Sequence, residues 1–240
     1  MKGDCDLKNI AFITGGSRGL GLATARGLQR NGIKPILFAK NPTRLANASS
    51  ELSATSYEVD LENHSETVEI FNRAISDHGV PDILMLAHGV MSDRMSKTLK
   101  TNYEEWRRVM AVNLDSVFTL VNLIGPMMSE RRSGRIIIYS ACLGRMSGPG
   151  NAGGLVPYRI SKAGVNAIVR NLAHETGHGS RGLFVDAVCP NHSRTDMGGA
   201  DAPRSAEEGA ECAIWLATRE LIPGQTQTGL LWEDNEIIPW

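Results

Sequence analysis

Apolar residues along this chain recur with two periods, one typical of buried strands and one typical of helices that bury a single face. Short runs such as Ile83-Leu84-Met85-Leu86 are apolar throughout, as in a parallel strand that is covered on both sides. Longer segments between these runs carry an apolar residue every three or four positions, which is the helical period. The pattern therefore predicts that strands and helices alternate along the chain.

The expected elements are as follows. Strands are expected at 10–13, 35–39, 57–61, 82–87, 135–140, 183–188 and 228–232. Helices are expected after the glycine-rich turn behind the first strand and at 42–53, 63–78, 102–132, 157–176 and 205–218, with Asn63 as one cap and Ser205 with Glu208 as a capping box. Strands and helices that alternate in this way predict an α/β fold with right-handed βαβ crossovers. The predicted architecture is a Rossmann-like, doubly wound parallel sheet of about seven strands with helices on both faces, in a single domain over residues 1–240.

Composition and charge narrow the class of protein. The chain has 240 residues, of which 42% are hydrophobic and 21% charged, as in a globular domain with a full core. Its net charge of −1 argues against a general nucleic-acid binder, and no apolar run reaches the roughly 18–20 residues that span a bilayer. The polar start at residues 1–8 lacks the apolar segment of a signal peptide. The four cysteines form no C-x-x-C pair, so we expect a cytoplasmic protein with reduced thiols and no nucleic-acid or membrane partner.

A glycine-rich turn links the first predicted strand to the first predicted helix. Its glycines stand at Gly15, Gly19 and Gly21, and such a turn lets the backbone approach a pyrophosphate closely. The helix behind it offers free N–H groups and a partial positive charge to an anion. Taken alone, the turn also suits a βα connection whose glycines serve packing only.

A second motif pairs Tyr158 with Lys162 near the start of another predicted helix. Residues four apart share one helix face. A phenol has a pKa near 10 and is a poor acid–base group at neutral pH, but a neighbouring ammonium favours its ionised form. The pair therefore suits proton transfer, although an exposed helix pair with no such role has the same spacing.

Taken together, these motifs resemble the short-chain dehydrogenases/reductases over nearly the whole chain. The family pattern T-G-x-x-x-G-x-G matches Thr14 to Gly21, and the family's catalytic pair matches Tyr158 with Lys162. The family's adenine-contacting segment matches Val59-Asp60-Leu61, and the segment of its catalytic Asn matches Val112-Asn113-Leu114. The P-G-x-V-x-T segment corresponds to Pro190 to Thr195. The tail from Arg194 is most similar to the carbonyl-reductase branch.

The resemblance implies two groups of site residues. The catalytic group is Tyr158, Lys162, Asn113 and Ser140, and the cofactor-binding group is Gly15, Ser17, Arg18, Gly19, Leu20, Gly21, Lys40, Asp60, Leu61, Gly89, Pro190 and Thr195. Tyr158 is expected to protonate a carbonyl oxygen while a hydride arrives from the nicotinamide. Lys162 is expected to lower the tyrosine pKa and hold the ribose, and Asn113 to support a proton relay.

The end of the second predicted strand indicates which nicotinamide cofactor is used. An acidic residue there would bind the ribose 2′-OH of NAD, but the sequence is Phe38-Ala39-Lys40-Asn41. Arg18 in the glycine turn adds a second cation, and two cations favour the 2′-phosphate of NADP(H). The alternative is that Lys40 is merely solvated.

Three positions depart from the family pattern. The family serine at the end of the fifth strand is replaced by Ala141, and Ser140 one residue earlier supplies the substrate hydrogen bond only if the long loop that begins at Cys142 turns it inward. The family's N-N-A-G segment is Leu86-Ala87-His88-Gly89 in this chain. His88 has two interpretations: a functional one, as a proton relay or a substrate contact, and a structural one, as a packed histidine. Asn191 replaces the glycine of the P-G segment. Candidate substrate contacts are His88, Cys142, Asn191 and His192.

One further motif, His174-Glu175-Thr176-Gly177-His178, spells the zinc-protease signature H-E-x-x-H. The signature requires an uninterrupted helix beside a cleft. Gly177 is instead expected to end the helix that begins near Tyr158. No metal site is predicted.

The sequence therefore predicts an NADP(H)-dependent enzyme of carbonyl-reductase type that reduces a ketone or aldehyde, or runs the reverse reaction, on a small-molecule substrate. Two alternatives remain: a cyclisation, dehydration or isomerisation in natural-product biosynthesis on the same fold, and a non-catalytic NADP(H)-binding sensor. The short segment behind Thr195 favours an open pocket for a bulky substrate. The helices that begin near Asn102 and Pro157 correspond to the family's subunit contact, so a homodimer or homotetramer is expected.

Overall fold

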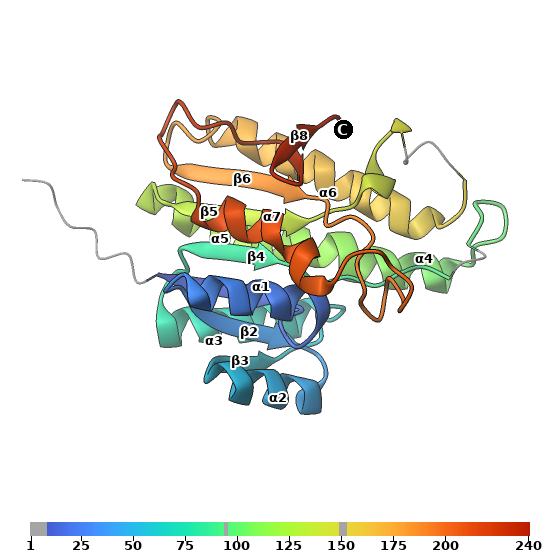
Figure 1. The fold of residues 1–240 in the computed structure, drawn as a ribbon, viewed down its shortest axis with the longest axis horizontal. Coiled ribbons are helices and arrows are strands. Elements are labelled where there is room, and N and C mark those ends of the chain that lie inside the picture. Colours follow the sequence, from blue (N-terminus) through green and yellow to red (C-terminus); the bar gives the residue numbers. More distant parts are fainter. Residues whose placement is uncertain (1–8, 94–95, 149–152) are drawn as a thin grey trace, which may run out of the picture.

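The computed structural model describes residues 9–93, 96–148 and 153–240, and within these residues one sheet joins eight strands in the order β3-β2-β1-β4-β5-β6-β7-β8 (Figure 1). The strands are β1 (Ile10–Thr14), β2 (Lys34–Ala39), β3 (Thr55–Glu58), β4 (Ile83–Leu86), β5 (Gly134–Tyr139), β6 (Leu183–Val188), β7 (Leu231–Glu233) and β8 (Glu236–Ile238). Pairings from β3 to β7 are parallel, and β8 is antiparallel to β7. The predicted doubly wound α/β class is confirmed, with one strand more than expected.

Helices cover both faces of the sheet (Figure 1). They are α1 (Gly19–Arg30), α2 (Pro42–Leu52), α3 (His64–His78), α4 (Tyr103–Met110), α5 (Ser116–Arg131), α6 (Val156–Glu175) and α7 (Ala206–Thr218). Neighbouring strand residues bury into different cores: Phe12 packs with Phe71 of α3, whereas Ile13 shares a core with Leu28 of α1. This alternation of side chains is why the strands are apolar on both faces.

The long helix predicted over 102–132 contains a change of winding. Between α4 and α5 the chain forms a π-helical turn, η1 (Ala111–Asp115), that contains the buried Asn113. Single π-turns of this kind are frequent at functional sites. The continuous stretch Tyr103–Arg131 has 29 residues and contains an 18-residue apolar window with a mean hydropathy of 1.4, enough by length and composition to cross a membrane, yet 56% of that window is buried inside the fold.

Two strand predictions need correction. The third strand runs over 55–58 instead of 57–61, because its register with β2 pairs Ile36 with Thr55 and Ala39 with Glu58. The last predicted strand begins at Leu231, and a hairpin carries it into β8. The hairpin turn uses Asp234 and Asn235 at φ 52° and 64°, the left-handed conformation that two-residue hairpins require.

The predicted helix ends are confirmed. Asn63 accepts a hydrogen bond from the Glu66 backbone N–H at the start of α3. Ser205 and Glu208 form both halves of a capping box on α7. Gly177, at φ 75°, follows the last residues of α6, where a left-handed residue closes the helix.

Candidate active site

The glycine turn has the geometry of an anion cradle at the carboxyl end of β1. A Cβ on Gly21 would lie 2.2 Å from the Gly15 carbonyl oxygen, and Gly15 itself has φ +65°, so both positions require glycine. Arg18 is the N-cap of α1 but gives no side-chain cap, and the first turn of α1 holds no acidic residue. The first N–H groups of α1, near Ser17 and Leu20, are therefore left for an anion such as a pyrophosphate.

The charged side chains beside this turn form ion pairs with two carboxylates of the chain itself. Arg18 and Arg44 both form ion pairs with Asp196, the second at 2.8 Å. Lys40 instead forms an ion pair with Asp60 at 2.6 Å. Both guanidinium groups bond to the same carboxylate oxygen of Asp196 and so lie close together, and burial, followed by the charge of Arg44, lowers the pKa of Arg18. Arg44 therefore shares its carboxylate partner with Arg18, whereas Lys40 pairs with a different carboxylate.

Arg44 was missed by the sequence analysis. The Asn41 side chain caps α2 by accepting the Arg44 N–H at 2.9 Å, which fixes Arg44 in the first helical turn. An arginine there is itself a signal, since the first turn of a helix usually carries acidic residues.

The predicted adenine-contacting residues follow β3. Leu61 is buried, and the Glu62 N–H donates to Asp60 Oδ1 at 3.1 Å.

Tyr158 and Lys162 lie on one buried face of α6. The Lys162 Nζ donates to the Tyr139 carbonyl at 2.7 Å and stands 5.8 Å from the centroid of the Tyr158 ring. Burial lowers the pKa of Lys162 to about 8. Burial, followed by the nearby Cys189 and Cys142, raises the pKa of Tyr158, so the phenol retains its proton at neutral pH.

Asn113 joins the π-turn to the segment behind β4. Its Oδ1 accepts from the Val90 N–H at 2.8 Å and its Nδ2 donates to the Val90 carbonyl at 2.9 Å. The same Nδ2 contacts the Ser161 hydroxyl at 3.1 Å. A Cβ on Gly89 would lie 3.4 Å from Asn113 Oδ1 and 3.7 Å from Lys162 Nζ. The predicted residues Gly89, Asn113 and Lys162 are thus brought together.

The hydroxyl of Ser140 bonds to a side chain of the protein and not to the substrate carbonyl predicted for it. Its hydroxyl donates to Asn166 Oδ1 at 2.5 Å, and Asn166 lies one helical turn beyond Lys162. A serine hydroxyl has one proton to donate, and here that proton is used inside the fold. Ala141, at the position of the family serine, has no donor. This geometry argues against Ser140 as the group that polarises a carbonyl.

His88 is a buried connection between three elements. Its Nδ1 lies 2.6 Å from the Thr14 hydroxyl and its Nε2 lies 2.7 Å from the Ser116 hydroxyl. The Ser116 hydroxyl donates to the Val112 carbonyl at 2.7 Å, so Nε2 carries the ring proton. Burial, and then the charge of Lys162, lowers the pKa of His88 to about 3. The geometry favours the packed histidine over the relay.

The segment behind β6 carries the remaining predicted residues, including Pro190. Asn191 has φ 57°, a conformation that glycine and asparagine tolerate best, and its amide lies between Glu233 and Arg204 at 3.2 Å. The exposed His192 bonds to the Gly198 carbonyl at 2.8 Å. The Thr195 methyl lies 3.1 Å from a Cβ built on Gly19, so this segment reaches the glycine turn.

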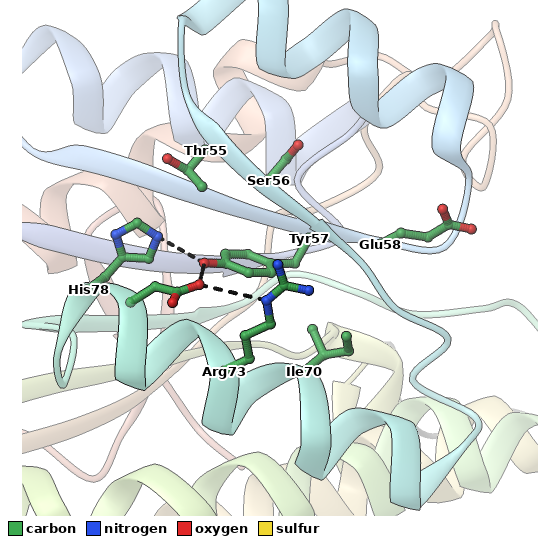
Figure 2. Close-up of a pocket in the computed structure, with 8 residues that line it drawn as sticks. Thr55, Ser56, Tyr57, Glu58, Ile70, Arg73 and His78 are labelled. Atoms are coloured by element: carbon green, nitrogen blue, oxygen red, sulfur yellow. Dashed lines mark hydrogen bonds and ion pairs between the residues drawn. The ribbon is translucent and has the colours of Figure 1, made fainter.

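Surface hollows lie away from these residues. One of about 520 Å³ is lined by β3 and α3 at the outer edge of the sheet. The Tyr57 hydroxyl there donates to Asp77 Oδ2 at 2.7 Å and lies 3.0 Å from His78 Nε2, and Figure 2 shows Tyr57 and His78 facing each other. A second, of about 330 Å³, contains His174 and His178. Within the described ranges, no group of three His, Cys, Asp or Glu side chains forms a metal site.

The fold and this arrangement define a Rossmann-like protein with a glycine-rich turn shaped as an anion cradle and a buried Tyr–Lys pair at the carboxyl edge of the sheet. The family model described as short chain dehydrogenase matches residues 9–206. The chain belongs to the short-chain dehydrogenase/reductase family, whose members bind a nicotinamide cofactor, and it is an oxidoreductase of that family.

The sequence is also similar to several known proteins. It is 30% identical to 3-oxoacyl-[acyl-carrier-protein] reductase of Synechocystis sp. over 78% of this chain and 75% of the relative. It is 29% identical to acetoacetyl-CoA reductase of Rhizobium meliloti over 92% and 96%. A solved structure described as ribose-5-phosphate isomerase from Brucella melitensis 16M superposes with a TM-score of 0.81 at 25% identity, over 93% and 89%. The gox2181 structure superposes with a TM-score of 0.82 at 22% identity, over 93% of each chain.

Proposed function

We propose that this protein is an NADP(H)-dependent reductase that converts a ketone or aldehyde to an alcohol, or catalyses the reverse reaction. The observation that carries the proposal is the placement of Tyr158, Lys162 and Asn113. They lie buried together at the edge of the sheet that also bears the glycine cradle. In open α/β sheets, ligands bind at this carboxyl edge.

Each of these side chains has a distinct task in the proposed reaction. NADPH, when bound, supplies the hydride. Tyr158 carries its proton at neutral pH, so it is the group that donates a proton to the carbonyl oxygen. The charge of Lys162 favours the phenolate that remains. Asn113 holds Val90 through two hydrogen bonds, which positions the segment behind β4 against the catalytic pair.

The preference for NADP(H) is supported by two guanidinium groups, those of Arg18 and Arg44, which meet at one place beside the cradle. Planar guanidinium groups are the usual partners of phosphate. Lys40, paired with Asp60, contributes less to this site than the sequence suggests.

The substrate is proposed to be a ketone. Two relatives are named for reduction of 3-oxoacyl or acetoacetyl thioesters, which makes acetoacetyl-CoA the first substrate to assay, beside cyclic and aromatic ketones. One observation supports the alternative function, a cyclisation, dehydration or isomerisation. The usual serine is replaced by Ala141, and the Ser140 proton is held by Asn166.

The proposal also covers assembly and location. Phe118 on α5 and Ile160 on α6 are 59% and 45% exposed, and large apolar side chains on two long helices suit a contact between subunits. A homodimer or homotetramer is therefore proposed. The proposed location is the cytoplasm, where Cys142, Cys189 and Cys212 stay as free thiols.

One experiment tests the proposed reaction. The protein is mixed with NADPH and the ketone panel, and loss of reduced nicotinamide is followed by absorbance. Oxidation that disappears in Tyr158→Phe and persists in the exposed control Tyr103→Phe supports the reductase. Conversion of a substrate without net NADPH use supports the alternative chemistry. Binding of NADPH without any conversion supports the non-catalytic sensor and contradicts both.

A further inference from the structure

Cys142 and Cys189 lie side by side, just beyond the carboxyl ends of two neighbouring strands. β5 and β6 pair in parallel up to Tyr139 and Val188, and the Ser140 N–H extends this pairing to the Val188 carbonyl at 2.8 Å. Immediately beyond it, the Cys142 backbone N–H donates to the Cys189 sulfur at 3.1 Å. The two cysteines are 47 residues apart in sequence, so only the sheet brings them together.

The two thiols differ in exposure and in acidity. Cys142 is half-buried, whereas Cys189 is buried. A hydrogen bond from the Cys189 thiol lowers the pKa of Cys142 to about 6, against the opposing effects of burial and of Glu233, and Arg145 lowers it further. The same hydrogen bond and burial raise the pKa of Cys189. Cys142 is therefore both the more accessible and the more acidic of the two thiols, which are the features of the thiol that reacts first.

Neither thiol has a task in the proposed hydride transfer, yet both lie within electrostatic reach of Tyr158. We infer that Cys142 and Cys189 form an oxidisable dithiol at the edge of the active site, which hydroperoxides convert to an intramolecular disulfide. Cys142 is the attacking residue, and Cys189 is the resolving residue.

The chemistry balances in two steps. The Cys142 thiolate attacks a peroxide oxygen of a hydroperoxide, so an S–O bond forms, the O–O bond breaks and the alkoxide leaves and takes up a proton as the alcohol. The Cys189 sulfur then attacks the Cys142 sulfenic acid, so the S–S bond forms and hydroxide leaves as water with the Cys189 proton. The two sulfurs lose two electrons in total, and the hydroperoxide gains them.

The position of Cys142 indicates how the disulfide would affect activity. Cys142 begins a short 3₁₀ turn (Cys142–Gly144) that packs directly on α6. A Cβ on Gly144 would lie 2.7 Å from the Lys162 carbonyl carbon, so the turn and the catalytic helix have no free space between them. A disulfide that displaces Cys142 is therefore expected to displace Lys162 and Tyr158, and to inhibit the enzyme reversibly.

The covalent part of this proposal is tested without any substrate. The parent is the Cys5→Ser variant, because Cys5 lies outside the described residues. The protein is treated with tert-butyl hydroperoxide, analysed by intact mass and digested for peptide mapping. We expect a protein lighter by about 2 Da with one Cys142–Cys189 cross-link. Cys189→Ser should stop at a sulfenic acid that dimedone traps on Cys142, and Cys142→Ser should yield no cross-link.

Cys212 provides the matched control, since it is buried and its pKa is raised to about 11. Cys212→Ser should form the same cross-link as the parent. A folded, oxidised parent without a link between Cys142 and Cys189 would overturn the proposal, as would a Cys189→Ser variant whose Cys142 is not trapped. The inhibitory effect rests on the proposed reductase function. NADPH oxidation should fall as the cross-link forms and return with dithiothreitol. Cross-linked protein with full activity would overturn the inhibition while leaving the reductase assignment intact.

Discussion

The Ser140 hydroxyl donates to Asn166 Oδ1 at 2.5 Å, so the serine nearest the family position gives its proton to a residue of α6 instead of to a substrate. The neighbouring Ala141, the N-terminal flank of the 3₁₀ turn, is the residue in line with the expected catalytic serine. The site therefore has a proton donor in Tyr158 but no second hydroxyl assigned to the carbonyl oxygen.

This arrangement predicts opposite results for two substitutions. Ala141→Ser should raise kcat/KM by about tenfold, because one donor to a developing oxyanion is worth about 2.7–4 kcal/mol in enzymes that use it fully. Ser140→Ala should lower the free energy of unfolding by about 1–2 kcal/mol, since it leaves the buried Asn166 oxygen without that donor, and should change kcat little. Steady-state kinetics and urea unfolding of both variants measure these effects. A large loss of kcat in Ser140→Ala would restore the catalytic role of Ser140.

Arg44 and Lys40 provide a matched comparison for cofactor preference. Arg44→Ala should raise KM for NADPH more than KM for NADH, by about tenfold, because it removes one of two guanidinium groups at the proposed phosphate site. Lys40→Ala should have the smaller effect, since Lys40 is paired with Asp60 at 2.6 Å. Initial rates with both cofactors decide the matter. A larger effect from Lys40→Ala would return the site to the arrangement that the sequence suggested.

Asp196 is an internal anion between Arg18 and Arg44. A carboxylate there repels the 2′-phosphate and competes with it for the same donors, so Asp196→Asn should tighten NADPH binding. The pairs are more than half exposed and such pairs are worth about 0–1 kcal/mol, so an increase in affinity of about two- to fivefold is expected. Fluorescence titration with NADPH and NADH measures it, with the exposed Asp201→Asn as control. Weaker NADPH binding in Asp196→Asn would show that the carboxylate positions the arginines instead.

His88 predicts a pH dependence of stability. Its pKa is about 3 in the folded protein and about 6.5 in an unfolded chain. Between these values the unfolded state binds a proton that the folded state does not. The free energy of unfolding should therefore fall as the pH drops below 6.5, by up to about 1.4 kcal/mol per pH unit.

Urea unfolding at several pH values tests this for His88. A loss of about 2 kcal/mol between pH 6.5 and about pH 5 should be absent from His88→Gln, whose amide does not titrate. His192→Gln is the control, since His192 is exposed. Equal pH dependence in the His88 variant and the parent protein would contradict a buried neutral histidine.

The exposed side chains Phe118 and Ile160 predict the oligomeric state. Phe118→Glu places a charge on the outer face of α5, and burying an unpaired charge in an interface is strongly unfavourable. The variant should elute as a smaller species than the parent in size-exclusion chromatography with light scattering. Leu99→Glu, at a position that is 97% exposed and outside the two long helices, should leave the assembly unchanged. Identical masses for Phe118→Glu and the parent would exclude α5 from the contact.

Short-range patterns in the sequence carried most of the fold. The apolar runs located β1, β4, β5 and β6, because a strand buried on both faces leaves a run without polar positions. The third strand was displaced because its register depends on β2. The hairpin of β7 and β8 was missed because its turn, Asp234 and Asn235, lacks the glycine that usually marks one.

The candidate site divides in the same way. The spacing of Tyr158 and Lys162 placed them on one helix face, since the helical period alone determines this. By contrast, Ser140 facing Asn166, Arg44 beside Arg18, and His88 between Thr14 and Ser116 all join residues far apart in the chain. Which side chain meets which depends on strand register and on how helices pack across the sheet.

The sequence by itself therefore determined the order of elements, the glycine cradle and the Tyr–Lys pair, because each depends on residues within a few positions of one another. Only the tertiary structure decided the partner of Ser140, the second cation beside Arg18, the neutral state of His88 and the meeting of Cys142 with Cys189. The physical reason is that the direction of a side chain at a strand end, and its burial, are set by elements distant in the chain.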